Sequence, residues 1–268
     1  MGENQPGSWA YQLLGYIEET SRAGVGQGFK CGDPNSKAAV GKMVATPVSI
    51  FYCPSRRAAQ GYPYANSSNT NFDPPPVMAK SDYACNVGDV GPSGLGTDVG
   101  PATVALAATY PWRYSGRIFL STQRLNKNFC PTGHTGVVFQ RSTISFNQIT
   151  DGTAYTYLYG EKNLRVEAYT GDEYASNDDQ SMYNGFDRDN VRSTYIFIAP
   201  NGIVTGHPPV PDTPGGDFTW QFGGAHSGGW MSVFCDGSVH FLSYDMDPVN
   251  HRRLGNRQDG ETIDSSRF

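Results

Sequence analysis

Acidic side chains gather in one stretch of the chain, residues 171–190, which has the sequence GDEYASNDDQSMYNGFDRDN. Carboxylate oxygens are ligands that calcium prefers in proteins. Counted from Asp187, however, the chain lacks the glycine at the sixth position and the glutamate at the twelfth position of the calcium-binding EF-hand loop. A calcium site and a solvated acidic loop are therefore both open interpretations, and calcium is the one cofactor that the sequence suggests. Its candidate ligands are Asp178, Asp179, Asp187 and Asp189.

Nucleophilic catalysis finds less support in the residue pattern. The chain lacks the G-x-S-x-G sequence that presents the catalytic serine of many hydrolases. His226 lies in FGGAHSGGW, residues 222–230, where the glycines let the backbone approach another group closely. Its neighbour Ser227 points in a different direction and forms no ready-made pair with it. We therefore expect no enzyme, and a secreted hydrolase is the third functional hypothesis.

The cysteines show no metal-binding pattern. They have neither a C-x-x-C pair nor the Cys/His spacing of zinc sites, so the sequence predicts no zinc. In an exported protein some of them would form disulfides, and the odd number would leave one free thiol. The five are Cys31, Cys53, Cys85, Cys130 and Cys235.

Two short helices are expected near the ends of the chain. Residues 8–20 place Trp9, Leu13 and Ile17 at i, i+4 and i+8, which is the spacing of an amphipathic helix. A second helix is predicted over 248–254, because an aspartate can cap it, a proline occupies its first position and a glycine follows its end.

Strands are expected in much of the remaining chain. In 155–159, Tyr155, Tyr157 and Tyr159 should share one face of a strand. Asp236 and Gly237 should join the last two strands in a two-residue type I′ turn, with Val233, Cys235, Val239 and Phe241 half-buried. The predicted strands cover 47–52, 143–147, 155–159, 194–199, 229–235 and 238–243.

Composition favours a folded, sheet-rich protein. Twenty Lys and Arg against 25 Asp and Glu give a net charge of −5, and no basic run exceeds a pair, which argues against a nucleic-acid partner. Aromatic residues reach 13% and turn formers are abundant. No apolar window approaches the roughly 18 residues of a membrane helix. We expect an α+β fold with a β-rich antiparallel sheet and long loops, in one domain over residues 1–268.

Six motifs, taken in order, resemble those of a very large planctomycete family of unknown function. The resemblance spans about residues 8–260. Members of the family resemble type IV prepilins or pseudopilins, and the group has also been labelled as bacterial extracellular solute-binding family 10. Members usually begin with a prepilin cleavage site and a long apolar helix, which this sequence lacks, so we expect a pilin-like headpiece. The motifs are SWAYQLLGYIEE, FYCPSRR, SDYACNVGD, GVVFQRS followed by ITDGTAYTYLYGEKNL, FGGAHSGGWMSVFCDGSVHFLS and HRRLGNRQDG.

The resemblance implies an exported, non-enzymatic protein at the cell surface or on the periplasmic face, acting in assembly or display. Its partners would be copies of itself, joined through the missing helix. The alternative is an extracellular module that binds a glycan or another solute. Among the motif positions, Arg56, Glu161 and His226 lack a simple structural explanation and are the candidate binding residues, expected in a polar cluster at the sheet edge. Cys53 and Cys85 both lie in motifs and are the candidate disulfide pair.

Overall fold

The computed structural model describes residues 7–25, 33–64, 72–91, 134–140, 142–171 and 173–264. Its helices and its largest sheet confirm the predicted α+β fold. None of the helices within these ranges is long and apolar enough to cross a membrane. The α-helices are α1 (Trp9–Leu13), α2 (Thr20–Ala23), α3 (Pro34–Ala45) and α6 (Pro248–Gly255). The strands are β1 (Tyr62–Pro63), β2 (Val77–Met78), β3 (Tyr83–Asn86), β4 (Tyr157–Glu161), β5 (Val191–Arg192), β6 (Ile196–Ile198), β7 (Val204–Gly206), β8 (Gly229–Phe234) and β9 (Val239–Ser243).

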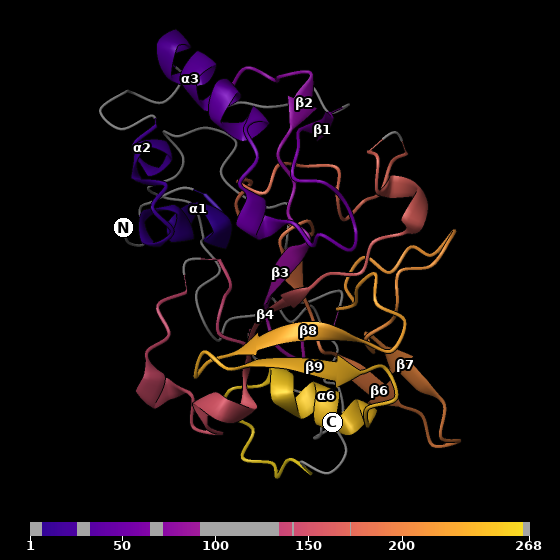
Figure 1. Ribbon diagram of the computed structural model, residues 1–268. Helices are drawn as coiled ribbons and strands as arrows, with labels where there is room; N and C mark the ends of the chain where they lie inside the picture. Colours follow the sequence, from indigo (N-terminus) through magenta and orange to yellow (C-terminus); the bar gives the residue numbers. More distant parts are fainter. Residues whose placement is uncertain are drawn as a thin grey trace, which may run out of the picture.

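A five-stranded sheet in the order β5-β3-β4-β8-β9 forms the centre of the structure (Figure 1). β5 runs parallel to β3, and the other neighbours are antiparallel. Helices α1, α2 and α3 lie towards one end of the molecule, while α6 packs beside β8 and β9 at the other (Figure 1). Two separate pairs, β1–β2 and β6–β7, complete the strands.

The N-terminal helix is confirmed but is shorter than predicted. Ser8 caps α1, and a 3₁₀ turn over Leu14–Tyr16 continues it. The helical path ends before Glu18, which adopts a φ of 64°. Trp9 and Leu14 are buried in the larger apolar cluster of the protein. The helix therefore anchors the N-terminal segment to the core.

Helix α3 was not predicted, because its sequence has only a weak apolar stripe. The Asp33 side chain caps the helix by accepting hydrogen bonds from the backbone of Asn35 and Ser36, at 2.9 and 3.1 Å. Pro34 follows in the first turn, where its missing N–H costs nothing. The same Asp-Pro signal begins α6, whose prediction is confirmed.

The expected tyrosine stripe is wrong, because a β-bulge interrupts β4. Tyr157 pairs with Phe234 and Tyr159 pairs with Val233. Over this step β4 therefore advances by two residues while β8 advances by one. Tyr157 consequently packs within the cluster that contains Trp230. Tyr159 instead contacts Trp9, with ring centroids 4.5 Å apart. Tyr155 lies before the strand in a 3₁₀ turn and is exposed.

Two other predicted strands are wrong. Residues 49–51 form a 3₁₀ turn instead of a strand. In 143–147, Ser145 and Gln148 form a capping box that begins another 3₁₀ turn, over Phe146–Gln148. The prediction over 194–199 is confirmed in its middle, as β6.

The β8–β9 hairpin is confirmed in its strands but not in its turn, and of its predicted half-buried residues only Val233 and Cys235 are shielded from solvent. Phe234 N donates to Ser238 O at 2.9 Å, which leaves a three-residue loop. In that loop Gly237, with a φ of 87°, takes the left-handed conformation, and Asp236 does not. Val239 and Phe241 are 60% and 55% exposed, while the opposite face, including Trp230, Phe234 and Leu242, is buried.

Replacing Asp33 by Ala should lower the free energy of unfolding by about 0.5–2 kcal/mol, because two backbone N–H groups of α3 lose their acceptor. Urea denaturation monitored by circular dichroism measures this change. Asp33→Asn keeps an oxygen acceptor and should retain most of the stability. An equal loss in both variants would show that the charge of Asp33, and not the cap, stabilises this region.

Candidate functional site

Three segments distant in the sequence bring Cys53, Glu161 and His226 together. Cys53 follows a 3₁₀ turn, Glu161 ends β4, and His226 lies in the loop before β8. The Cys53 Sγ lies 3.8 Å from the His226 Nε2, and the Glu161 Oε1 lies 3.3 Å from the same nitrogen. One donor atom from each side chain falls within 4.8 Å of both others. In the part of the chain that the structure describes, this is the only such group of three or more metal-ligating side chains.

The cluster opens to solvent on the side of the histidine. The side chain of Glu161 is 1% exposed and that of His226 is 33% exposed. Cys53 is buried. An approaching ligand therefore meets His226 first and reaches the thiol and the carboxylate behind it.

The buried carboxylate is held by the backbone around it. The Glu161 Oε2 accepts a hydrogen bond from Met231 N at 2.8 Å, and the Glu161 carbonyl accepts one from Gly223 N at 3.0 Å. A Cβ at Gly224 would lie 2.8 Å from Oε2, so the close approach of this backbone requires glycine. This contact accounts for Gly224, whereas a Cβ at Gly223 would clash with the Val210 carbonyl oxygen.

The thiol is fixed from the opposite side. Cys53 N donates to the Asp82 Oδ2 at 2.8 Å. Burial, together with the neighbouring Glu161 carboxylate, raises the pKa of the Cys53 thiol to about 11. At neutral pH the free site therefore holds a protonated thiol rather than a reactive thiolate.

The geometry does not suit a catalytic triad. In a triad, the two ring nitrogens of the histidine contact the nucleophile and the acid separately. Here Cys53 and Glu161 both face the Nε2 of His226. The three side chains converge on one point, which suits the binding of a ligand better than the relay of a proton.

Arg56 lies next to this cluster and supports it indirectly. Its Nη2 donates to the carbonyl of Lys162 at 2.7 Å, the residue after Glu161. Its Nη1 lies 3.3 Å from the Asp82 Oδ1, and its Nε lies 2.8 Å from the Asp212 Oδ2. Of the three residues predicted to cluster, the structure thus pairs Glu161 with His226 and places Arg56 behind them.

Arg57 and Asp178 form a second buried ion pair, farther from the site than Arg56. Both oxygens of Asp178 accept from Arg57, at 2.7 and 3.1 Å, and one also accepts from the Lys162 Nζ at 2.8 Å. Burial alone would raise the pKa of Asp178, but the charges of Arg57 and Lys162 outweigh it and hold the pKa well below its usual range. Asp178 is therefore an ion-paired structural carboxylate.

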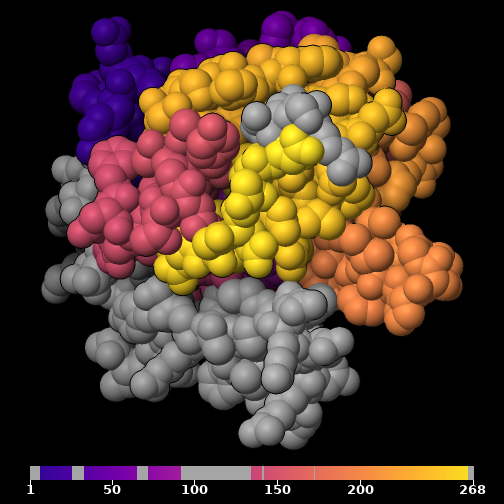
Figure 2. Space-filling model, turned by 90° about the horizontal axis from the view of Figure 1, so that it is seen from below, coloured from indigo at the N-terminus to yellow at the C-terminus, as the bar shows by residue number. Residues whose placement is uncertain are grey.

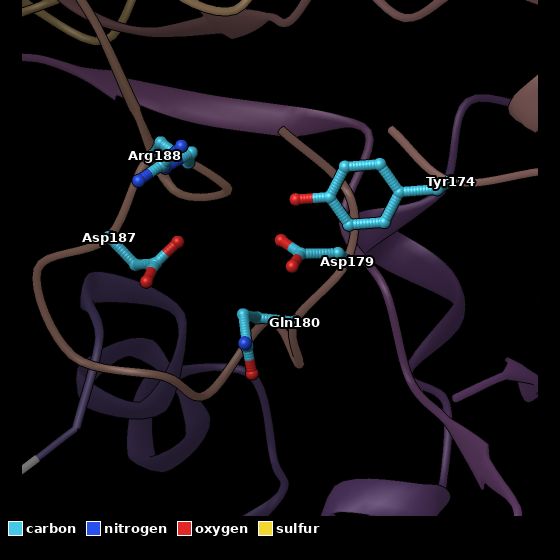
Figure 3. A pocket seen from close by; sticks show the side chains of 5 residues that line it. All are labelled: Tyr174, Asp179, Gln180, Asp187 and Arg188. Atoms are coloured by element: carbon cyan, nitrogen blue, oxygen red, sulfur yellow. The ribbon is translucent and has the colours of Figure 1, made fainter. Parts of the chain in front are cut away.

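The side chains of the other candidate calcium ligands do not take part in the ion pair of Asp178 with Arg57. Asp189 is buried and accepts from Gln180 N at 2.5 Å, and burial raises its pKa to about 7. Asp179 and Asp187 face each other across an open pocket of about 240 Å³ (Figure 3). The structure does not gather the four carboxylates around one point. The pocket is lined by Tyr174, Asp179, Gln180, Asp187 and Arg188.

The predicted disulfide between Cys53 and Cys85 is wrong. Both are free thiols, as is Cys235. Cys85 lies in β3 within the main apolar cluster, where its thiol donates to the carbonyl of Val138 at 3.6 Å. Cys53 instead faces His226. The other two cysteines, Cys31 and Cys130, lie outside the described residues.

The sequence motifs anticipated part of this site. Glu161 and His226 stood out because turn chemistry does not explain them, and Cys53 was assigned to the wrong partner. Lys162 and Asp212 were missed, because a lone lysine or aspartate in a loop carries no local signal of burial. Only the convergence of their segments in space reveals their role.

The segments that form the cluster all lie within residues 2–249, which match the family model SBP_bac_10, described as "Protein of unknown function (DUF1559)". The chain belongs to this family. The short name of the family refers to solute binding, which agrees loosely with the alternative function predicted from the sequence. No curated protein and no solved structure shows significant similarity to the chain.

Replacing Asp178 by Asn should destabilise the protein by about 3–5 kcal/mol at pH 7, because Arg57 and Lys162 would remain buried without their shared carboxylate. Denaturant titration measures the loss. Asp245→Asn, at an exposed position, is the control and should change the free energy of unfolding little.

The difference in unfolding free energy between the wild type and Asp178→Asn should depend on pH. The folded-state pKa of Asp178 is depressed, so its contribution is complete above the unfolded pKa of about 3.9 and declines as the pH falls below it. The stability difference between the wild type and Asp178→Asn should therefore shrink in acid. A difference that stays constant down to pH 3 would contradict the ionic origin of this stabilisation.

Proposed function

We propose that the chain is an extracellular, non-enzymatic binding module that captures a small solute at Cys53, Glu161 and His226. The observation that carries this proposal is the convergence of three polar side chains on one point, with a buried acid and a half-exposed histidine. Binding sites commonly place a few convergent polar groups on a rigid frame. The family name and the export predicted from the sequence support the same assignment.

The frame around the site supports binding because it is fixed before any ligand arrives. Glu161 is held by backbone N–H groups, and Cys53 is held by Asp82. A site whose donor atoms are already oriented loses little conformational freedom when it binds. The loop that carries His226 is the part of the site that a ligand can reach.

A panel of solutes tests this proposal by thermal denaturation. The probes are the chlorides of zinc, calcium and magnesium, a set of monosaccharides and the free amino acids. A solute that binds only the folded state raises the melting temperature. At least one class should do so for the wild type and for His240→Ala, and not for His226→Ala.

The control histidine, His240, lies exposed on β9 and away from the cluster of three donors. If no probe shifts the melting temperature, or if every shift survives in His226→Ala, the proposed binding function is contradicted.

A second candidate function is assembly or display, as the pilin-like resemblance implies. Its specific support is the apolar surface of β9, the edge strand of the central sheet, where Val239 and Phe241 are exposed. Edge strands with exposed apolar side chains readily pair with other chains. The β6–β7 hairpin, which projects from the side of the molecule in Figure 2, adds exposed apolar residues: Phe197, Ile198 and Val204.

If the exposed face of β9 mediates assembly, the wild type should self-associate with rising concentration in sedimentation velocity. Replacing both Val239 and Phe241 by Ser should abolish this association, because the apolar contact area is lost. Tyr16→Ser removes an exposed aromatic side chain elsewhere and serves as the control. A monomeric wild type, or equal association in all three proteins, would reject this role for β9.

A further inference from the structure

We propose that Cys53, Glu161 and His226 bind a thiophilic divalent cation of the zinc class. This inference rests on the proposed binding function and names the class of solute. Nothing in the spacing of the sequence suggested it, because the three residues come from three different segments. The fold brings their donor atoms to one place.

The chemistry of the donor set favours this class of ion. The three side chains offer one sulfur, one imidazole nitrogen and one carboxylate oxygen. Calcium and magnesium prefer ligand sets made of oxygen alone. Zinc is held by cysteine, histidine and acidic side chains, and thiolate ligands favour it over the harder ions.

The distances fit a tetrahedral ion. Zinc bonds of about 2.0–2.3 Å at tetrahedral angles place neighbouring ligand atoms about 3.3–3.6 Å apart. The Nε2 of His226 lies 3.3 Å from the Glu161 oxygen and 3.8 Å from the Cys53 sulfur. The remaining separation, between the Cys53 sulfur and a Glu161 oxygen, is within 4.8 Å.

The contacts around the ligands also match those of metal sites. Ligating carboxylates are usually oriented by further hydrogen bonds. The second oxygen of Glu161 accepts from Met231 N at 2.8 Å, which leaves Oε1 directed at His226. Asp82 fixes the backbone of Cys53 in the same way.

Without an ion, the Glu161 carboxylate can hold the other two side chains by hydrogen bonds. If the Nε2 of His226 carries a hydrogen, that hydrogen can serve one acceptor, and the Glu161 oxygen is the nearer one. The protonated thiol of Cys53 can then donate to the same Glu161 carboxylate, which helps to raise its pKa. A cation at the common point would contact all three atoms at once.

Three protein ligands leave one tetrahedral position unfilled. Zinc sites with three protein ligands keep a water or an external ligand in the fourth position. The exposure of His226 places that position towards solvent. The bound ion would therefore carry a water molecule or a donor atom from a further solute.

Cobalt(II) titration of the full chain under reducing conditions tests this inference. Cobalt replaces zinc in tetrahedral sites, and its thiolate charge-transfer absorption reports a bond to sulfur. We expect one cobalt per chain, the charge-transfer band, and displacement by zinc. Cys53→Ser should abolish the band, and His226→Ala should weaken the affinity at least tenfold.

Matched controls separate this site from other donors. Cys235→Ser removes another buried free thiol, and His240→Ala removes an exposed histidine, so both should bind as the wild type does. Because Glu161 is buried, Glu161→Gln is accepted as evidence only if its circular dichroism matches that of the wild type. His226→Ala lies at the solvent side of the site and keeps the test decisive if Glu161→Gln fails to fold.

The outcomes distinguish the two proposals. Absence of the charge-transfer band, or a band that persists in Cys53→Ser, would overturn the cation site. If a sugar or an amino acid then still raises the melting temperature in a His226-dependent way, the binding function stands and the cation is wrong. If neither cobalt nor any solute binds, both proposals fail.

Discussion

Two adjacent arginines, Arg56 and Arg57, are buried, and the surrounding structure must neutralise both. Moving an unpaired charge out of water costs several kcal/mol, so each guanidinium requires carboxylates in place when the chain folds. Asp82 lies between the two, with Oδ1 3.3 Å from Arg56 and 2.7 Å from Arg57. Asp212 completes the first pair and Asp178 the second. These ion pairs join the turn that carries the arginines, the bend before β3 and two loops.

The candidate site depends on this ionic centre. The carboxylate of Asp82 that receives both arginines also accepts from the backbone of Cys53. Arg56 donates to the carbonyl of Lys162, which fixes the chain just beyond Glu161. The side chain of Lys162 then enters the same centre through Asp178. Cys53 and Glu161 are thus positioned by charged side chains that do not themselves face the point where a ligand would bind.

The sequence predicted the parts of the fold whose signals are local. The cap of α6 and the pairing of β8 with β9 depend on residues a few positions apart, and both are confirmed. The bulge in β4 was not foreseen, because it is set by how Tyr157 and Tyr159 pack on opposite clusters. The loop between β8 and β9 is one residue longer than predicted, because a two-residue type I′ turn needs two positive φ values and only Gly237 takes one.

The site was predictable only in its residue types. His226 and Glu161 attracted notice because no turn or cap explains them, yet their pairing with Cys53 requires the sheet order that places β4 beside β8. Cys53 and Cys85 looked like partners because both lie in motifs, whereas β3 directs Cys85 into the core. Sequence spacing cannot show which of two burial environments a thiol enters.

Charge balance at the site bears on which ion it would accept. Metal ligation requires a deprotonated thiol and a neutral imidazole. Glu161 and the Cys53 thiolate then supply two negative charges, which a divalent cation cancels. A monovalent cation would leave one negative charge, and a trivalent one would add a positive charge beside the buried Arg56. Because uncompensated charge near a buried ionic centre is costly, the site favours a divalent ion over either alternative.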